Sequence, residues 1–465
     1  MKTPMRLVPN NRLILWTGGL FFPGTLVAVL VPPASPFCYG GLMFFLLLVG
    51  LDVVLSRRLL EGVRVRLPEI VRLTRAKDAR IEIAIQNLDG RQKEFRLGLS
   101  LPRQFVSPHP DMRVELAPET PHFSLPWPCK ALERGDYALD KCYLEINSRL
   151  GFWALRGVAE AGCRIRVYPD LRMERQTLAA LFMQNNLGIH AHRQIGKGRD
   201  FEQLREYIPG DSFEDIHWKA TAKRGAPISK IYQIERTQKV YIILDASRLA
   251  ARNAAIFHDG WRGERRRTEE PQNGNRRDTI LERFIAAALI IGMAAERQGD
   301  NFGVVAFADR VRGFLRAKNG RSHYQSCRDM LCLLEPEKVT PDFAELFTFL
   351  STKIRKRALL IFLTSLDDPA MADGFIEHVG MLRRHHLVMV NMLKPAAANP
   401  LFTTPVQDSV NALYNRLAGH FLWDSLDQTA RTLNRAGVGF SLLDNEKLCP
   451  QLVTQYLNIK QRQLL

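Results

Sequence analysis

The sequence predicts two N-terminal transmembrane helices, then a β-sandwich, then an α/β domain built on a parallel sheet. Three observations carry this prediction. Two long apolar stretches open the chain, short alternating segments follow as far as Asp170, and apolar runs then alternate with helical patterns to the C-terminus. We therefore expect a transmembrane helical hairpin over residues 1–58, a β-sandwich over 59–170 and the α/β domain over 171–465.

The hairpin is predicted by a stretch without any charged residue, from position 13 to position 51. Prolines divide it into residues 13–31 and 37–55, each close to the ~20 residues that a membrane-spanning helix needs. The first apolar part is too long for a signal peptide, and no small-residue cleavage site follows it. Basic residues flank both outer ends, which predicts a multi-pass protein of the bacterial inner membrane with its soluble domains on the cytoplasmic side. These flanking residues are Lys2, Arg6, Arg12, Arg57, Arg58, Arg64 and Arg66.

Short alternating segments separated by Pro and Gly-Asp turns predict the β-sandwich. In the third part, apolar runs of the buried-strand kind alternate with helical periodicity, which predicts a parallel sheet covered on both faces. The expected strands of this third part are 240–244, 302–307, 358–363, 387–393 and 438–443, and the expected helices are 279–298, 341–354, 370–384 and 409–436. The Arg-rich segment 250–277 between them predicts a loop.

The chain is basic, with 65 Lys and Arg against 48 Asp and Glu and a formal net charge of +17. Such an excess indicates either a nucleic-acid surface or attraction to anionic lipid. The basic runs at 262–267 and 353–357 are short and carry no interleaved aromatic residues on which bases would stack, so the lipid interpretation is favoured. Seven cysteines without a CxxC pair predict free thiols in a reducing compartment.

A dense charged segment precedes the first strand of the α/β domain. Pro209-Gly210 predicts a turn, Asp211 an N-cap paired with Glu214, and Gly225 a helix stop, so a short amphipathic helix is expected between them. Its charged residues form either a solvated helix face or a surface that docks another protein. We expect them both to stabilise the local structure and to dock a partner. The residues concerned are Arg205, Glu206, Asp211, Trp218, Lys219 and Arg224.

This segment also carries a resemblance. The pattern G-K-G-x-x-F-x-x-L-R-E-Y-x-P-G-D-x-x-x-x-I-x-W-K-A-x-A-K-R-G from Gly196, followed by a strand ending in Asp245-Ala-Ser247-Arg248, resembles the domain-of-unknown-function fifty-eight family. The stretch RGDYALDKCYLEINSRLGFW and the junction at 167–170 are similar to it as well. The resemblance implies a von Willebrand A-like fold and an association with a MoxR-type AAA+ ATPase.

In von Willebrand A domains a D-x-S-x-S motif, a later Thr and a later Asp hold a divalent cation. The resemblance therefore implies Asp245, Ser247, Thr340 and Asp367 as ligands of a degenerate metal site. Leu249 replaces the second Ser and Ser365 stands where an Asp is expected. Because Mg²⁺ requires near-ideal oxygen coordination, we expect at most weak Mg²⁺ binding and no other cofactor.

No nucleophile elbow, zinc-protease motif or catalytic Cys signature is present in the sequence. We therefore expect a non-enzymatic, membrane-anchored interaction or scaffold protein. It would work with a MoxR-type AAA+ ATPase on an unknown client, in contact with membrane lipid and without nucleic acid. The alternatives are a Mg²⁺-dependent adhesion-type binding module and a basic binder of nucleic acid or anionic lipid.

Overall fold

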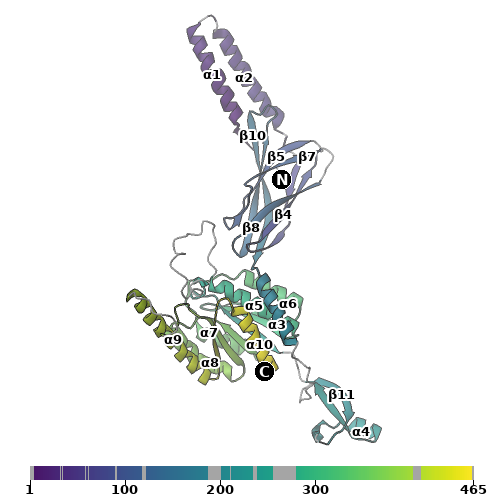
Figure 1. Cartoon of the computed structure of the whole chain (residues 1–465). Coiled ribbons are helices and arrows are strands. Elements are labelled where there is room, and N and C mark those ends of the chain that lie inside the picture. The colour runs from purple at the N-terminus through teal and green to yellow at the C-terminus, as the bar shows by residue number, and fades with distance from the viewer. Residues whose placement is uncertain are drawn as a thin grey trace. The chain divides into compact units, whose positions relative to one another are not determined.

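A computed structural model describes residues 5–462 except 32, 34, 58, 61, 90–91, 118–121, 187–199, 210, 234–237, 255–278 and 402–409. The chain divides into two compact units, Met1–Asp170 and Leu171–Leu465 (Figure 1). Gly196-Lys197-Gly198, which opens the family motif, and the basic run 262–267 lie outside the described residues. So does most of the expected loop at 250–277, of which residues 250–254 are described.

Two apolar helices lie near the start of the first unit, as predicted. Helix α1 spans Asn11–Leu30 and helix α2 spans Ser35–Ser56, and both are long and apolar enough to cross a membrane. The two helices pack side by side (Figure 1). The side chain of Asn10 caps α1 by accepting a hydrogen bond from the Asn11 N–H at 2.7 Å.

The rest of the first unit consists of strands in two sheets that share one apolar core. One sheet has the order β1-β10-β9-β5-β7, and β3 pairs with residues 164–168 of β10 on the same edge as β1. The second sheet has the order β2-β4-β8-β6. All pairs are antiparallel except β3 with β10. The strands are β1 (Met5–Pro9), β2 (Val63–Arg66), β3 (Ile70–Thr74), β4 (Asp78–Asn87), β5 (Lys93–Leu99), β6 (Phe105–Val106), β7 (Met112–Leu116), β8 (His122–Ala131), β9 (Gly135–Asn147) and β10 (Trp153–Tyr168).

Strand β1 corrects the expected boundary of the hairpin. It precedes α1 in the chain, yet it pairs with β10 from Met5↔Gly157 to Pro9↔Trp153. The start of the chain therefore belongs to a sheet of the β-rich part rather than to the hairpin alone. A basic flank such as Arg6 is compatible with a sheet edge as well as with a membrane end, so composition does not reveal the pairing.

The turn between β9 and β10 holds the end of α2. The buried carboxylate of Asp52 accepts hydrogen bonds from the Ser148 hydroxyl at 2.6 Å and from the Leu150 N–H at 3.0 Å. The Ser56 hydroxyl donates to the same carboxylate at 3.3 Å. The indole N–H of Trp153 donates to the Val49 carbonyl at 3.2 Å. A buried carboxylate is stable only when it is hydrogen-bonded, and these donors provide the hydrogen bonds that Asp52 needs.

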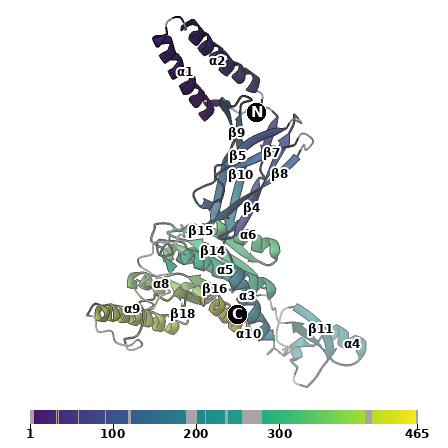
Figure 2. The same cartoon turned by 45° about the horizontal axis from the view of Figure 1, so that its top comes forward.

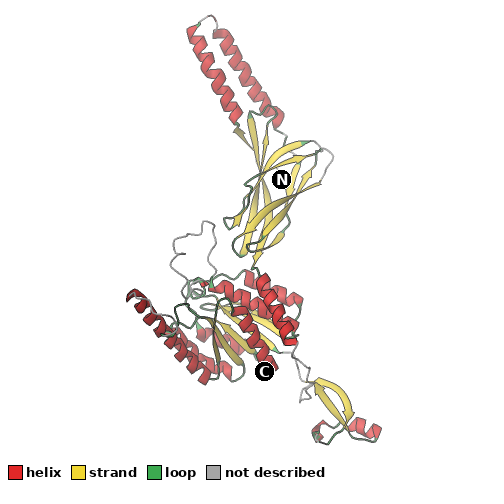
Figure 3. Cartoon of the chain, in the orientation of Figure 1, coloured by secondary structure: helices red, strands yellow, loops and turns green. Residues whose placement is uncertain are grey.

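The second unit contains a six-stranded sheet of order β15-β14-β13-β16-β17-β18, in which β13, β14, β16, β17 and β18 are parallel and β15 is antiparallel. Its helices separate into two groups, one on each apolar face, and Figure 3 shows helix and strand alternating in this part. The strands are β13 (Lys239–Asp245), β14 (Asn301–Phe307), β15 (Val311–Lys318), β16 (Leu359–Leu363), β17 (Leu387–Leu393) and β18 (Gly439–Leu443). The helices are α3 (Arg172–Asn186), α5 (Ile280–Arg297), α6 (Arg321–Cys332), α7 (Phe343–Lys353), α8 (Pro369–Arg383), α9 (Val410–Arg435) and α10 (Leu448–Gln461).

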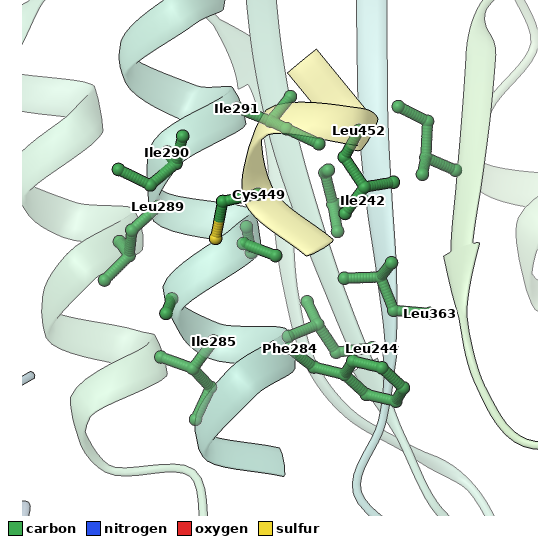
Figure 4. Packing of buried hydrophobic residues seen from close by; sticks show 14 of the residues in the cluster. Ile242, Leu244, Phe284, Ile285, Leu289, Ile290, Ile291, Leu363, Cys449 and Leu452 are labelled. Atoms are coloured by element: carbon green, nitrogen blue, oxygen red, sulfur yellow. The ribbon is translucent and has the colours of Figure 1, made fainter. Parts of the chain in front are cut away.

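Helix α5 is the central element of one face. Its residue Phe284 points toward Leu244 of β13, and Cys449 of α10 belongs to the same buried cluster (Figure 4). Helices α7, α8 and α9 supply the opposite apolar cluster, and Figure 2 gives a second view of these helices. With both faces covered, the central strands are buried along their whole length, which explains their continuous apolar sequences.

A small hairpin module follows α3 in the chain. Strand β11 (Asp200–Glu206) pairs antiparallel with β12 (Ile228–Gln233), and between them lie a 3₁₀ turn at Phe213–Asp215 and helix α4 (Trp218–Arg224). We refer to residues 200–233 as the hairpin module.

Candidate functional site

The carboxyl ends of the parallel strands place polar residues together at one edge of the large sheet. Strand β13 ends at Asp245 and its neighbour β16 ends at Leu363, directly before Thr364. Such an edge is where ligands bind in open α/β sheets. Backbone hydrogen bonds join the loops there, from the Ala246 N–H to the Phe307 carbonyl at 2.7 Å and from the Glu337 N–H to the Ala246 carbonyl at 2.7 Å. We refer to this set of loops as the carboxyl edge.

Asp245 is the buried acid of the carboxyl edge, with 1% of its surface exposed. One carboxylate oxygen accepts from the Ser247 N–H at 2.8 Å and the other accepts from the Thr364 hydroxyl at 2.7 Å. Burial raises the pKa of Asp245 above its ordinary value of 3.8, opposed by hydrogen bonds from Ser247 and Thr364 and by the positive charge of Arg252. Both oxygens are thus engaged inside the protein.

Arg252 supplies a cation to this edge from the chain itself. Its guanidinium donates to the two carboxylate oxygens of Asp367 at 2.5 and 3.1 Å, and its Nε donates to the Leu249 carbonyl at 2.9 Å. The side chains of Arg252 and Asp367 are 33% and 19% exposed. A bidentate pair of this kind is the strongest form of charged hydrogen bonding between side chains.

The four implied metal ligands do not fit a divalent cation. Asp367 is bound to Arg252, and both oxygens of Asp245 already accept hydrogen bonds. The Ser247 hydroxyl accepts from the Leu249 N–H at 3.3 Å, and Thr340 is exposed. An arginine so close would also repel a metal ion. In the described part of the chain, no group of three or more His, Cys, Asp or Glu side chains is arranged to hold a metal.

Two residues of the carboxyl edge are absent from the sequence-based set. Thr364, rather than Thr340, gives the hydroxyl that contacts Asp245, because the parallel register aligns Leu244 with Leu363. Arg252 lies in a segment whose Gly, Pro and Arg content predicts a loop, yet the neighbouring Ala250 and Ala254 are fully buried. Strand pairing between β13 and β16 was the available signal for Thr364. No local pattern marks Arg252.

The hairpin module holds the second predicted set of residues. Its Arg205 donates to Asp211 at 2.7 Å, and the other oxygen of Asp211 accepts from the Ile208 N–H at 3.1 Å. The expected N-cap role of Asp211 is wrong. Ile216 pairs with Ser229 and interrupts the helix, so α4 begins only at Trp218, and His217 caps it by accepting from the Ala220 N–H at 3.0 Å. The predicted stop at Gly225 is confirmed, since that residue has φ of 70°.

Large aromatic side chains are exposed on this module. Phe213 is 74% exposed and Trp218 is 69% exposed, and the ring of Phe213 stacks on Tyr207 with centroids 6.1 Å apart. Glu206, Lys219 and Arg224 are exposed as well. Exposed single hydrophobic residues are ordinary, but exposed Trp and Phe framed by charged side chains have the composition of a protein-binding surface.

Comparisons with solved structures give distant similarities. The chain is similar to "Crystal Structure of the SpRpn10 VWA domain" at 9% identity and a TM-score of 0.26, covering 47% of this chain and 95% of that one. It is similar to proximal thread matrix protein 1 from the mussel byssus at 12% identity and a TM-score of 0.23, covering 47% and 46%. An uncharacterized membrane spanning protein from Vibrio fischeri matches at 12% identity and a TM-score of 0.16, covering 48% and 98%.

No curated protein matches the chain. A family model described as "Protein of unknown function DUF58" matches residues 203–254 and 267–400. The match includes Asp245, Arg252, Thr364 and Asp367 of the carboxyl edge, together with most of the hairpin module. This is the family that the sequence motif resembles, and the similarity covers these residues of the chain.

Proposed function

We propose that this chain is a membrane-anchored, non-enzymatic interaction protein with a von Willebrand A-like domain. In this proposal it works with a MoxR-type AAA+ ATPase in the chaperone-like assembly of a client protein. The helices α1 and α2 form the anchor, the β-rich part is a β-sandwich spacer, and the second unit recruits partners on the cytoplasmic side of the inner membrane.

The observation that carries the interaction role is the exposure of Phe213 and Trp218 on the hairpin module. A tryptophan buries a large area on binding at low cost in conformational entropy, and such residues dominate the binding energy of interfaces. Lys219 and Arg224 lie on the same short helix and are exposed. We assign the ATPase to this surface, which would present an aromatic anchor framed by positive charge.

The junction at Asp52 supports the anchoring role. A flexible anchor would need no specific contact with the domain that follows it. Here Asp52 and Ser56 of α2 hydrogen-bond to the turn at 148–150, so the end of the helix is fixed to the β-rich part. The apolar surfaces of α1 and α2 are largely exposed within the chain, which suits contact with lipid.

The carboxyl edge supports a role that does not depend on metal. The adhesion-type module, in which a divalent cation bridges to a partner, requires oxygen ligands that Arg252 and the internal hydrogen bonds occupy. We therefore place partner binding on the hairpin module rather than on a cation at Asp245.

Two experiments test the proposal. Full-length protein carrying an affinity tag is purified from native membranes in mild detergent, and co-purifying proteins are identified by mass spectrometry. We expect a MoxR-type ATPase in the wild-type eluate and its depletion with Trp218→Ala. Separately, a reporter fused after residue 465 should behave as cytoplasmic and one inserted near residue 34 as external. Absence of any AAA+ ATPase, or an external C-terminal reporter, would contradict the corresponding half of the proposal.

A further inference from the structure

A group of basic side chains lies at the amino edge of the large sheet, opposite the carboxyl edge. The segments that lead into β16, β17 and β18 all meet there, because these three neighbouring strands are parallel. The segments before β16 and β17 are rich in Lys and Arg, and the segment before β18 contributes Arg435. None of the three, taken as residues 353–358, 383–386 and 435–438, contains an Asp or Glu. We refer to the exposed bases Lys353, Arg355, Lys356, Arg357, Arg383, Arg384 and Arg435 as the basic edge.

Contacts between the segments show that these bases form one surface. The Leu387 N–H donates to the Ala358 carbonyl at 3.0 Å, which joins the segments before β16 and β17. The guanidinium of Arg383 lies over Gly437, where a Cβ atom would meet its Nε at 2.7 Å, and this joins the segments before β17 and β18. Three stretches far apart in the sequence thus bring their charges together.

Five bases of the basic edge have no acidic partner in the part of the chain that the structure describes. Among the described residues, no carboxylate forms an ion pair with Lys353, Arg355, Lys356, Arg383 or Arg384. Like charges held close together repel one another, and an anionic ligand would relieve this repulsion. The three segments, residues 353–358, 383–386 and 435–438, contain no Phe, Tyr or Trp, so they offer charge without these aromatic side chains.

We propose that the basic edge binds the anionic headgroups of membrane lipids. This inference rests on the membrane anchor of the proposed function, because a chain held in a bilayer keeps its other domain at a high effective concentration near the headgroups. Each Lys or Arg side chain held close to an anionic leaflet adds to the electrostatic attraction between the protein and the lipid headgroups. Single-stranded nucleic acid would need aromatic side chains on which its nucleobases can stack, and the segments of the basic edge provide no such side chain.

The test uses full-length protein in nanodiscs made of phosphatidylcholine alone or with phosphatidylglycerol. A water-soluble amine reagent modifies exposed lysines, and mass spectrometry follows Lys353 and Lys356. Exposed Lys338, in the loop at the carboxyl edge, is the internal reference. We expect modification of Lys353 and Lys356 to slow about fivefold in anionic discs while Lys338 is unchanged. Raising salt from about 0.1 M to about 1 M shortens the Debye length from about 10 Å to about 3 Å and should abolish the difference.

A charge-reversed variant and a matched control make the result specific. The double variant Arg355→Glu with Arg384→Glu should lose the lipid effect, whereas Arg248→Glu with Arg310→Glu, exposed at the carboxyl edge, should keep it. Equal modification in both kinds of disc would overturn the inference. So would stronger protection by a short DNA duplex in neutral discs, which would assign the edge to nucleic acid. Failure of the chain to enter nanodiscs of either composition would instead contradict the anchor.

Discussion

Arg252 binds both carboxylate oxygens of Asp367, at 2.5 and 3.1 Å, at the edge of the sheet where Asp245 is buried. This pair puts a fixed guanidinium where the fold would otherwise present free oxygen ligands. Asp245 and Ser247 match two positions of the metal motif, whereas the later acid Asp367 is paired with Arg252. The acid serves the internal structure, through its hydrogen bonds to Ser247 and Thr364.

The first prediction is that the protein does not bind Mg²⁺ tightly. Calorimetric titration of the full-length chain in detergent with Mg²⁺ or Mn²⁺ should show no binding below the millimolar range, because two carboxylates are already engaged. Arg252→Gln should free Asp367 and strengthen cation binding relative to the wild type. A tight wild-type isotherm that disappears in Asp245→Ala would contradict this view of the site.

The second prediction concerns pH. Because burial raises the pKa of Asp245, the native protein holds this proton more firmly than the unfolded chain does. The protonated acid therefore contributes to the free energy of unfolding at low pH. This contribution is lost as the pH rises from about 3.8, the ordinary pKa, through the higher pKa of the native protein. Asp245→Asn keeps the acceptor for the Ser247 N–H but has no proton to lose, so this decline should be missing. Melting temperatures measured across this pH range compare the two, and parallel profiles would refute the assignment.

The third prediction concerns the junction of α2 with the β-rich part. Asp52→Leu would leave the Ser148 hydroxyl and the Leu150 N–H without their acceptor, at a cost of about 2–3 kcal/mol. Thermal unfolding of the full-length protein in detergent measures the loss. Ser124→Ala, which removes an exposed hydrogen bond to Glu82, is the control and should stay within about 0.5 kcal/mol. An Asp52→Leu protein as stable as this control would show that the junction contributes nothing.

The sequence predicts elements better than it predicts contacts between them. The five parallel strands of the second unit have apolar runs that are long enough to recognise, and Thr279 and Gln298 mark the ends of α5 as caps. Strand β15 is only half-buried and carries three basic residues, so it lacks the continuous apolar run of the other strands. Strand β1 is too short and too near an apolar helix to be recognised before its pairing with β10 is known.

The candidate site follows the same rule. Asp245 and Ser247 are predictable because they directly follow a buried strand. Thr364 and Arg252 act across distances of 119 and 115 residues in the chain, to Asp245 and Asp367 respectively, and local spacing carries no information about such pairs. Asp211 accepts hydrogen bonds from Arg205 and the Ile208 N–H rather than from helix N–H groups, and the β-bridge at Ile216 precedes the start of α4.

The fourth prediction concerns this turn. Asp211 ties Arg205 and the Ile208 N–H together, so Asp211→Ala should destabilise the hairpin module by about 1 kcal/mol, given that both side chains are partly exposed. Hydrogen exchange of the amides in β11 and β12 reports on the module alone. Glu214→Ala, at an exposed neighbouring position, is the matched control. Equal exchange rates in the two variants would show that Asp211 does not stabilise the hairpin module.

The most direct test of the central claim is the affinity of the full-length protein for the ATPase that co-purifies with it. Trp218→Ala removes the largest exposed anchor of the hairpin module, and we expect the dissociation constant to rise at least about tenfold. Tyr143→Ala, an aromatic residue 47% exposed on β9, should change it by less than about twofold. Biolayer interferometry with the full-length protein immobilised measures both. Wild-type affinity in a folded Trp218→Ala protein would contradict the claim that this module recruits the partner.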